Sequence, residues 1–111
     1  MSKLLVDGKL ICLDQDDCLL NLSDWTPEVA AALALKEGIV LTQAHWEIIQ
    51  LVRQFYQQFE LAPANRALVK YIAQELGPEK GNSLYLNPLF AGKPAKLAAR
   101  LAGLPKPANC F

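Results

Sequence analysis

The sequence predicts a mainly α-helical domain of about five helices, preceded by a β-hairpin and followed by a short C-terminal arm. Three observations lead to this class: an Asp-Gly pair between two apolar runs, helical spacing of apolar residues over most of the remainder, and two prolines close to the end. At 111 residues and 52% apolar content, the chain is suited to one domain with its own core. No apolar run approaches the ~20 residues of a membrane span, and no signal peptide precedes the domain, so we expect a cytoplasmic protein without a membrane partner.

The hairpin is predicted from the segment LLVDGKLI at residues 4–11. Asp7 and Gly8 suit the positive φ angles of a type I′ turn, which joins two strands through two residues. The following segment, LDQDDCLLNL, is expected to add another turn and a short extended piece. Because so few strands are predicted, we expect this sheet to be an N-terminal appendage to a helical domain.

Capping residues begin the first two predicted helices. Thr26 is the expected N-cap of the first, with Pro27 at its first position, and Gly38 ends it. Thr42 caps the next and longest helix, in which apolar residues recur at helical spacing as far as Phe59.

Glycine and proline delimit the three remaining helices. One follows the break ELAPAN and ends at Gly77, which precedes a proline. A short helix is opened by Asn82 or Ser83, and a last one begins at Pro94 and is closed by Gly103.

After the last helix the chain is expected to continue as a flexible arm. Pro105 and Pro107 lack backbone donors and bias the residues before them to extended backbone. A polyproline-like segment rises ~3.1 Å per residue, so the arm reaches roughly 20 Å from the last helix. Cys110 stands at its tip, one residue from the end. We therefore divide the chain into a globular domain, 1–103, and an arm, 104–111.

The other chemically active side chains favour structural roles. The number of cysteines is odd and no export signal is visible, so a disulfide framework is not expected. The single histidine, His45, lies far along the chain from every cysteine, and we expect neither a metal nor a cofactor. We predict that Cys12 is a half-buried small apolar residue, that Cys18 is structural, and that His45 serves packing or helix capping.

A thiol at the end of a proline-stiffened arm is suited to entering the active site of another protein. Sulfur and disulfide exchange proceed by thiolate attack and depend on access as much as on the thiol pKa. From residue type and position alone, Cys110 is equally well explained as an incidental terminal residue or as one buried by a tail that folds back. The combination of helix stop, prolines and cysteine favours the exchange role.

Most of the chain resembles the DsrC/TusE family. The resemblance lies in HWEIIQLVRQFYQQF, PANRALVKYI, GPEKGNSLYLNPLF and GKPAKLAARLAGLPKPANC, and its most specific parts are EKGNS, PAK and AGLPKP-x-x-C. It implies a small orthogonal helical domain with an N-terminal hairpin and a mobile C-terminal arm. It also implies that the penultimate residue, Cys110, carries sulfur.

One position separates the two branches of this family. Proteins of the DsrC branch, partners of dissimilatory sulfite reductase, have a second cysteine eleven residues before the last one, where this chain has Ala99. With one arm thiol, the chain is similar to the TusE branch instead. That branch takes persulfide sulfur from a TusBCD-type donor complex and passes it to an MnmA-type tRNA thiouridylase for 2-thiouridine formation at the wobble position. Two departures from the family pattern are Cys18, usually glycine, and Phe111, usually a small aliphatic residue.

The resemblance thus implies a sulfurtransferase that acts as a persulfide carrier within a relay, with little turnover alone. A DsrC-like partner of sulfite reductase in sulfur oxidation or reduction is the alternative within the family.

The basic residues gather toward the C-terminus. Residues 1–60 hold nine acidic and four basic side chains, whereas residues 61–111 hold two acidic and seven basic ones. Such a distribution attracts an acidic protein surface or a phosphate backbone, although a solvated basic face explains it as well. The candidate docking residues, for an acidic partner or for tRNA held by that partner, are Lys93, Lys96, Arg100, Lys106, Arg66 and Lys70.

A DNA-binding regulator is the non-enzymatic alternative. The two helices around ELAPAN resemble a helix-turn-helix, with the hairpin as a wing. The second of these helices offers few base-reading side chains, and the zero net charge does not favour autonomous DNA binding.

Overall fold

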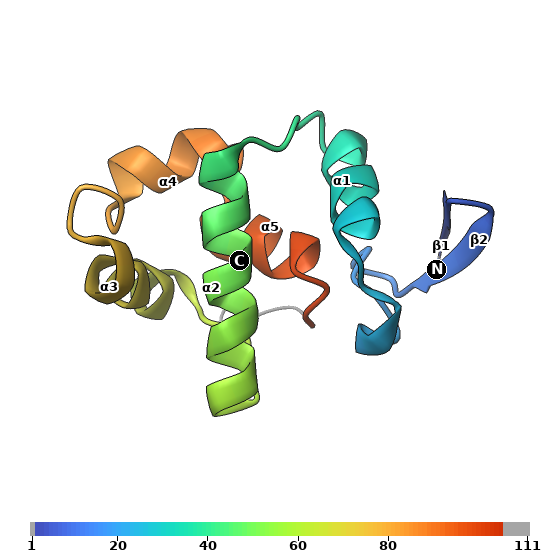
Figure 1. Cartoon of the computed structure of the whole chain (residues 1–111), viewed down its shortest axis with the longest axis horizontal. Helices are drawn as coiled ribbons and strands as arrows, with labels where there is room; N and C mark the ends of the chain where they lie inside the picture. Colours follow the sequence, from blue (N-terminus) through green and yellow to red (C-terminus); the bar gives the residue numbers. More distant parts are fainter. Residues whose placement is uncertain (1, 106–111) are drawn as a thin grey trace.

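The computed structural model describes residues 2–105, and residues 1 and 106–111 lie outside the described part. Its elements are β1 (Ser2–Val6), β2 (Lys9–Leu13), a 3-10 turn (Leu22–Asp24), α1 (Pro27–Lys36), α2 (Gln43–Phe59), α3 (Asn65–Leu76), α4 (Ser83–Leu89) and α5 (Pro94–Leu101). In Figure 1, α2 and α5 occupy the middle of the molecule, with α3 and α4 on one side and α1 and the hairpin on the other. This arrangement confirms the predicted class of five helices after an N-terminal hairpin.

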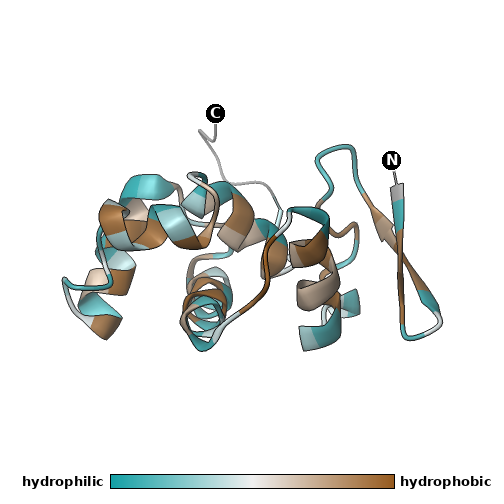
Figure 2. Ribbon diagram, turned by 90° about the horizontal axis from the view of Figure 1, so that it is seen from above, coloured by the Kyte–Doolittle hydropathy of each residue, from teal (hydrophilic) through white to brown (hydrophobic). Residues whose placement is uncertain are grey.

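The hairpin has the predicted turn. Its two strands pair antiparallel, with Leu4 opposite Ile11, and both of these side chains are buried. Asp7 and Gly8 have φ angles of 50° and 78°, as a type I′ turn requires at both central positions. Figure 2 shows apolar residues along the strands and polar ones at the tip of the hairpin.

The turn after β2 is built on the side chain of Asp14. Its Oδ1 accepts hydrogen bonds from the backbone N–H groups of Asp16 at 2.8 Å and of Cys18 at 3.0 Å. An isolated bridge between Leu13 and Leu19 closes the turn. The turn and short extended piece expected from the sequence are therefore present, and the turn brings Cys18 into the interior.

Side-chain caps begin the helices where the sequence predicts them. Thr26 Oγ1 accepts from Val29 N at 3.2 Å at the start of α1, and Gly38, with φ of 73°, follows its end. Asn82 rather than Ser83 caps α4, because its Oδ1 accepts from Tyr85 N at 2.9 Å.

His45 has the capping and packing role that the sequence favoured. Its Nδ1 accepts from Thr42 N at 3.0 Å, which completes a capping box at the start of α2. Its Nε2 lies 2.7 Å from the carbonyl oxygen of Leu89, so the neutral ring carries its proton on Nε2. The ring also meets Phe90 edge to face at 5.4 Å. His45 thereby joins the first turn of α2 to the end of α4.

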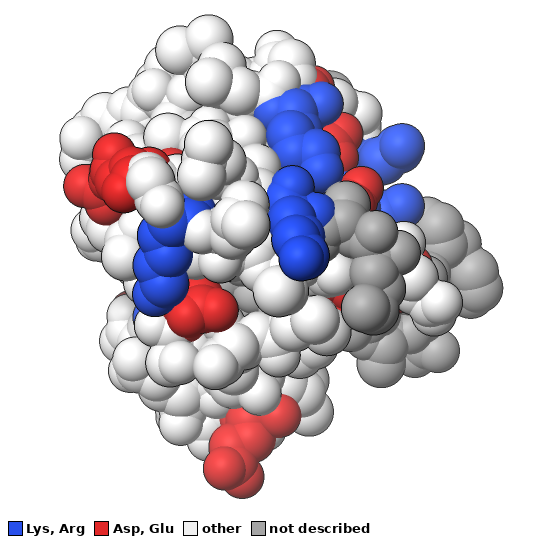
Figure 3. Space-filling view, turned by 90° about the vertical axis from the view of Figure 1, so that its right-hand side faces the viewer, with Lys and Arg blue, Asp and Glu red and all other residues white. Residues whose placement is uncertain are grey.

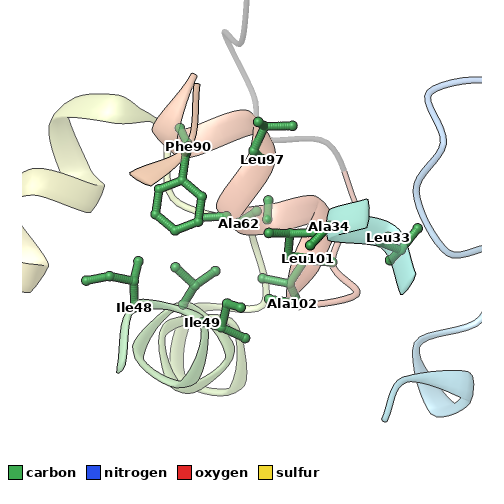
Figure 4. Close-up of a cluster of buried hydrophobic side chains, with 14 of the residues drawn as sticks. Leu33, Ala34, Ile48, Ile49, Ala62, Phe90, Leu97, Leu101 and Ala102 are labelled. Atoms are coloured by element: carbon green, nitrogen blue, oxygen red, sulfur yellow. The ribbon is translucent and has the colours of Figure 1, made fainter. Parts of the chain in front are cut away.

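The core surrounds α5, which packs against the four other helices. Alanines on its buried faces let its backbone approach its neighbours closely. Figure 4 shows the centre of this core, formed by α1, α2, the α2–α3 connection and the segment from the end of α4 through α5. The labelled side chains are Leu33, Ala34, Ile48, Ile49, Ala62, Phe90, Leu97, Leu101 and Ala102. Because α5 is central, the last residues of the described chain are fixed by the packing of the whole domain.

Within residues 2–105, no helix combines the length and apolarity that a bilayer span requires.

Candidate functional site

The chain stays packed against the domain for three residues after α5. The backbone N–H of Gly103 donates to the carbonyl of Arg100 at 3.1 Å, and that of Leu104 donates to Ala99 at 2.9 Å. Leu104 is buried, one residue beyond the expected domain boundary at 103, whereas Pro105 is exposed. We call residues 101–104 the root of the C-terminal segment. The predicted site residue Cys110, together with Lys106 and Phe111, lies outside the described residues.

Two side chains from distant parts of the sequence hold this root. Trp25 Nε1 donates to the carbonyl of Leu101 at 2.8 Å, and Arg53 Nη1 donates to that of Ala102 at 2.7 Å. The guanidinium carbon of Arg53 lies 3.9 Å from the centroid of the Trp25 ring, in a cation–π contact. The last carbonyls of a helix have no partner within the helix, so both bonds satisfy groups that need one. Burial lowers the pKa of Arg53 from its ordinary value, but an arginine remains protonated in proteins.

Gly103 is needed at this root for two reasons. Its φ of 78° lies in the left-handed region, and a Cβ added there would come within 2.6 Å of Trp25 Cδ1. The sequence identified Gly103 as a helix stop but gave no sign of the tryptophan packed on it. The sequence shows only that Trp25 precedes the predicted N-cap Thr26. Nothing in that position indicates that its indole N–H binds Leu101, 76 positions away.

An open groove of about 470 Å³ lies beside the root. Its wall on α2 presents amide side chains at helical spacing, and among its lining residues only Arg53 is charged. The lining residues are Trp25, Pro27, Gln50, Arg53, Gln54 and Gln57.

Four of the predicted docking residues gather where α3 and α5 begin. Asn65 Oδ1 accepts from Ala95 N at 3.1 Å, which holds the start of α3 against the start of α5. Arg66 and Lys70 line a second groove, of about 420 Å³, between α3 and α4. The basic surface, as we call it, consists of Arg66, Lys70, Lys93 and Lys96, none of which is ion-paired with an acid among the described residues.

Arg100 does not belong to this surface, and here the prediction is wrong. Its side chain is buried, with 8% of the residue exposed. The guanidinium donates to the Glu37 carboxylate and, at 2.9 Å, to the carbonyl of Asp16. Neighbouring helices cover most of the surface of α5, so Arg100 faces inward although it lies only one turn from Lys96. Arg100 holds the turn before α1 and the end of α1 against α5.

The opposite end of the molecule carries charges of both signs, with acidic side chains in excess. Figure 3 views it from the side of the hairpin and α1, where basic and acidic side chains occur on the same face. Two ion pairs lie in this part, Lys9 with Asp24 at 3.6 Å and Lys36 with Asp17 at 3.8 Å. The four bases of the basic surface differ from Lys9 and Lys36 in having no acidic partner among the described residues.

The two described cysteines differ in environment. Cys12 is exposed on β2, so its predicted half-burial is wrong: its neighbours Ile11 and Leu13 occupy the buried face of the strand. Cys18 is buried, as a structural role requires. Burial raises the pKa of its thiol, the carboxylate of Asp14 raises it further, and a nearby guanidinium opposes both.

Neither described cysteine belongs to a metal-ligating cluster. Among residues 2–105, no three side chains of His, Cys, Asp or Glu lie close enough together to hold a metal ion. The candidate site thus consists of Cys110, which is predicted from the sequence, and of the root, which the structure describes.

Comparison with known proteins identifies the family. A family model described as DsrC like protein matches residues 5–111. The sulfurtransferase TusE of Yersinia pseudotuberculosis is 51% identical over 95% of this chain and 97% of its own length. The sulfurtransferase TusE of Photorhabdus laumondii is 50% identical over the whole of both chains.

Solved structures show the same fold. The NMR structure of Allochromatium vinosum DsrC matches with a TM-score of 0.89 and 46% identity, over 99% of this chain and 98% of that one. The oxidized γ-subunit of dissimilatory sulfite reductase (DsrC) from Archaeoglobus fulgidus matches with a TM-score of 0.85 and 41% identity, over 99% and 100%. The family model, the relatives and the solved structures agree, and the protein belongs to the DsrC/TusE family.

Proposed function

We propose that this protein is a sulfur-relay carrier that accepts persulfide sulfur on Cys110 and passes it to an acceptor enzyme. The observation that carries the proposal is the identity of about half of all positions, over the full length, with proteins named sulfurtransferase TusE. The match of the family model extends to residue 111 and so includes the cysteine.

The chemistry needs one thiol and no external oxidant. The Cys110 thiolate attacks the terminal sulfur of a donor persulfide, R–S–SH. The S–S bond of the donor breaks, its inner sulfur leaves as a thiolate, and Cys110 becomes Cys110–S–SH. A thiolate of the acceptor then attacks the terminal sulfur in the same way, which transfers that sulfur and regenerates the Cys110 thiolate. Each step exchanges one S–S bond for another.

The proposed partners are a TusBCD-type donor complex and an MnmA-type tRNA thiouridylase. The basic surface supports association with an acidic partner or with tRNA that the acceptor holds, because its four charges have no internal acidic partner among the described residues. Neutralising Lys93 and Lys96 together should weaken association with the acceptor at low salt and reduce its dependence on ionic strength. An affinity that is equal to wild type at every salt concentration would exclude this surface.

The carrier role is tested on Cys110 itself. The protein is treated with a persulfide donor, and the C-terminal peptide is examined by mass spectrometry for one added sulfur. Cys110→Ser should abolish the addition, and Cys12→Ser, which removes the exposed thiol on β2, should leave it unchanged. In a strain that lacks the relay protein, wild type and Cys12→Ser should restore tRNA 2-thiouridine and Cys110→Ser should not. A C-terminal peptide without added sulfur would end the proposal.

A DsrC-like role is the second candidate, because solved relatives with that name share 46% and 41% of their residues with this chain. The resemblance places the second thiol of that branch at Ala99, a residue that is 1% exposed within α5. Binding to a sulfite reductase without restoration of 2-thiouridine would favour this role. DNA affinity that survives in Cys110→Ser, with normal tRNA thiolation, would favour the regulator instead.

A further inference from the structure

We propose that Trp25 and Arg53 are positioning residues for sulfur transfer, because they fix the place and direction from which the cysteine-bearing segment starts. The inference rests on the proposed carrier function. It concerns two residues outside that segment, one before α1 and one in the middle of α2.

The root is held from several directions. The indole N–H of Trp25 and the guanidinium of Arg53 bind two successive carbonyls, those of Leu101 and Ala102, at 2.8 and 2.7 Å. Their cation–π contact at 3.9 Å fixes the two side chains relative to each other. The next residue, Gly103, packs directly on the indole ring. These contacts restrain translation and rotation of the last turn more than a helix-ending glycine alone does.

The packing continues to the last buried residue. Leu104 is 2% exposed and its N–H is bonded to the carbonyl of Ala99. From exposed Pro105 to Cys110 there are only five peptide links, and an extended chain spans at most about 3.3–3.6 Å per residue. The thiol is thus confined to a sphere of roughly 18 Å around a fixed point. A short tether makes the reachable volume sensitive to where the tether begins.

Transfer between two proteins is sensitive to such placement. The attacking sulfur must approach along the S–S bond that breaks, inside the active site of the partner. A displacement of about 1 Å, even from a change far from the chemistry, can lower a rate by about 100-fold. A small reagent in solution approaches the same thiol from any side and does not depend on the direction of the segment. The two reactions therefore separate positioning from accessibility.

The groove beside the root supplies a matched control. Gln54 lines the same groove as Trp25 and Arg53 but makes no bond to the root in the described structure. If that groove acts as a docking surface for a partner, Gln54→Ala should impair transfer as much as changes in the two positioning residues. If the root contacts matter, Gln54→Ala should behave as wild type.

The experiment compares Trp25→Phe, Arg53→Gln, Arg53→Lys and Gln54→Ala with wild type in the full-length protein. Each protein is loaded with persulfide sulfur. Two rates are then measured: transfer to the MnmA-type acceptor in the presence of tRNA, and removal of the sulfur by cyanide. Circular dichroism confirms that each variant is folded at the assay temperature.

Trp25→Phe keeps a ring against Gly103 and removes the N–H donor, and Arg53→Gln removes the cation–π contact. We expect each to slow transfer to the acceptor about 10-fold or more, while the cyanide rate changes less than about 2-fold. Arg53→Lys keeps a donor and a charge, and should recover part of the transfer rate.

Transfer by Trp25→Phe and Arg53→Gln at the wild-type rate would overturn the inference, as would an equal loss in both reactions or an equal loss in Gln54→Ala. Each of these results leaves the carrier function intact as long as wild type delivers sulfur. A wild-type protein that takes up no sulfur on Cys110 would refute the proposed function itself, and the inference with it.

Discussion

The buried guanidinium of Arg100 depends on Glu37, and removal of that carboxylate should destabilise the fold. Nη1 donates to Glu37 and Nη2 to the carbonyl of Asp16, while Nε has no partner among the described residues. Loss of one member of a buried ion pair costs about 3–5 kcal/mol, because the remaining charge stays buried. The Glu37 side chain is 32% exposed, so water replaces part of what is lost. We therefore expect Glu37→Ala to lower the free energy of unfolding by about 2 kcal/mol.

Urea unfolding followed by tryptophan fluorescence and circular dichroism measures this change. For a domain of this size, 2 kcal/mol corresponds to a decrease in Tm of roughly 8 °C. Lys9→Met is the matched control, because it breaks an ion pair whose lysine side chain is 68% exposed. Its effect should stay below about 0.5 kcal/mol.

The double variant Glu37→Ala with Arg100→Met separates the cost of an unpaired charge from the loss of attraction. A buried pair replaced by apolar side chains is often close to neutral, so the double variant should regain more than half of the stability that Glu37→Ala loses. A Glu37→Ala protein as stable as Lys9→Met would refute the reasoning. So would a double variant less stable than Glu37→Ala alone.

Three further predictions follow from individual sites. Gly81→Ala should destabilise the protein by about 3 kcal/mol, measured by urea unfolding, because the new Cβ would lie 2.3 Å from the backbone of Ala73; a stable Gly81→Ala protein would contradict this close packing. Iodoacetamide should modify exposed Cys12 well before buried Cys18, as read by peptide mass spectrometry, and equal rates would show that Cys18 is accessible. The raised pKa of Cys18 means that the unfolded chain loses this proton first, near its ordinary value of 9.0, so stability should fall as pH rises above about 9. Cys18→Ala should reduce that slope in unfolding measurements from pH 8 to 10, and an unchanged slope would exclude the thiol as its source.

The elements that the sequence predicts correctly have signals contained within a few residues. Asp7 and Gly8 form a turn that depends only on their own φ angles. Thr26 and Asn82 cap helices through N–H groups three residues away. The capping role of His45 is equally local, although its second bond reaches the end of α4. Residues this close along the chain are held near one another by the backbone, so these turns and caps can be predicted from the sequence alone.

The two wrong assignments have different causes. Spacing along a helix groups Lys96 and Arg100, but it does not say how much of the helix surface is covered by neighbours. Four helices surround α5, and Arg100 faces inward. Cys12 was assigned by residue type, whereas its exposure follows from the alternation of β2, in which Ile11 and Leu13 face the core.

The sequence by itself determined the hairpin, the five helices and the cysteine near the end of the chain, because turns, caps and residue identities are local properties. Only the tertiary structure decided what holds the root of the C-terminal segment. Trp25 lies 76 positions from Leu101, and Arg53 lies 49 positions from Ala102. Such pairs meet because all the helices bury their apolar faces in one shared core. This packing brings donors next to carbonyls whose distance along the sequence does not predict the contact.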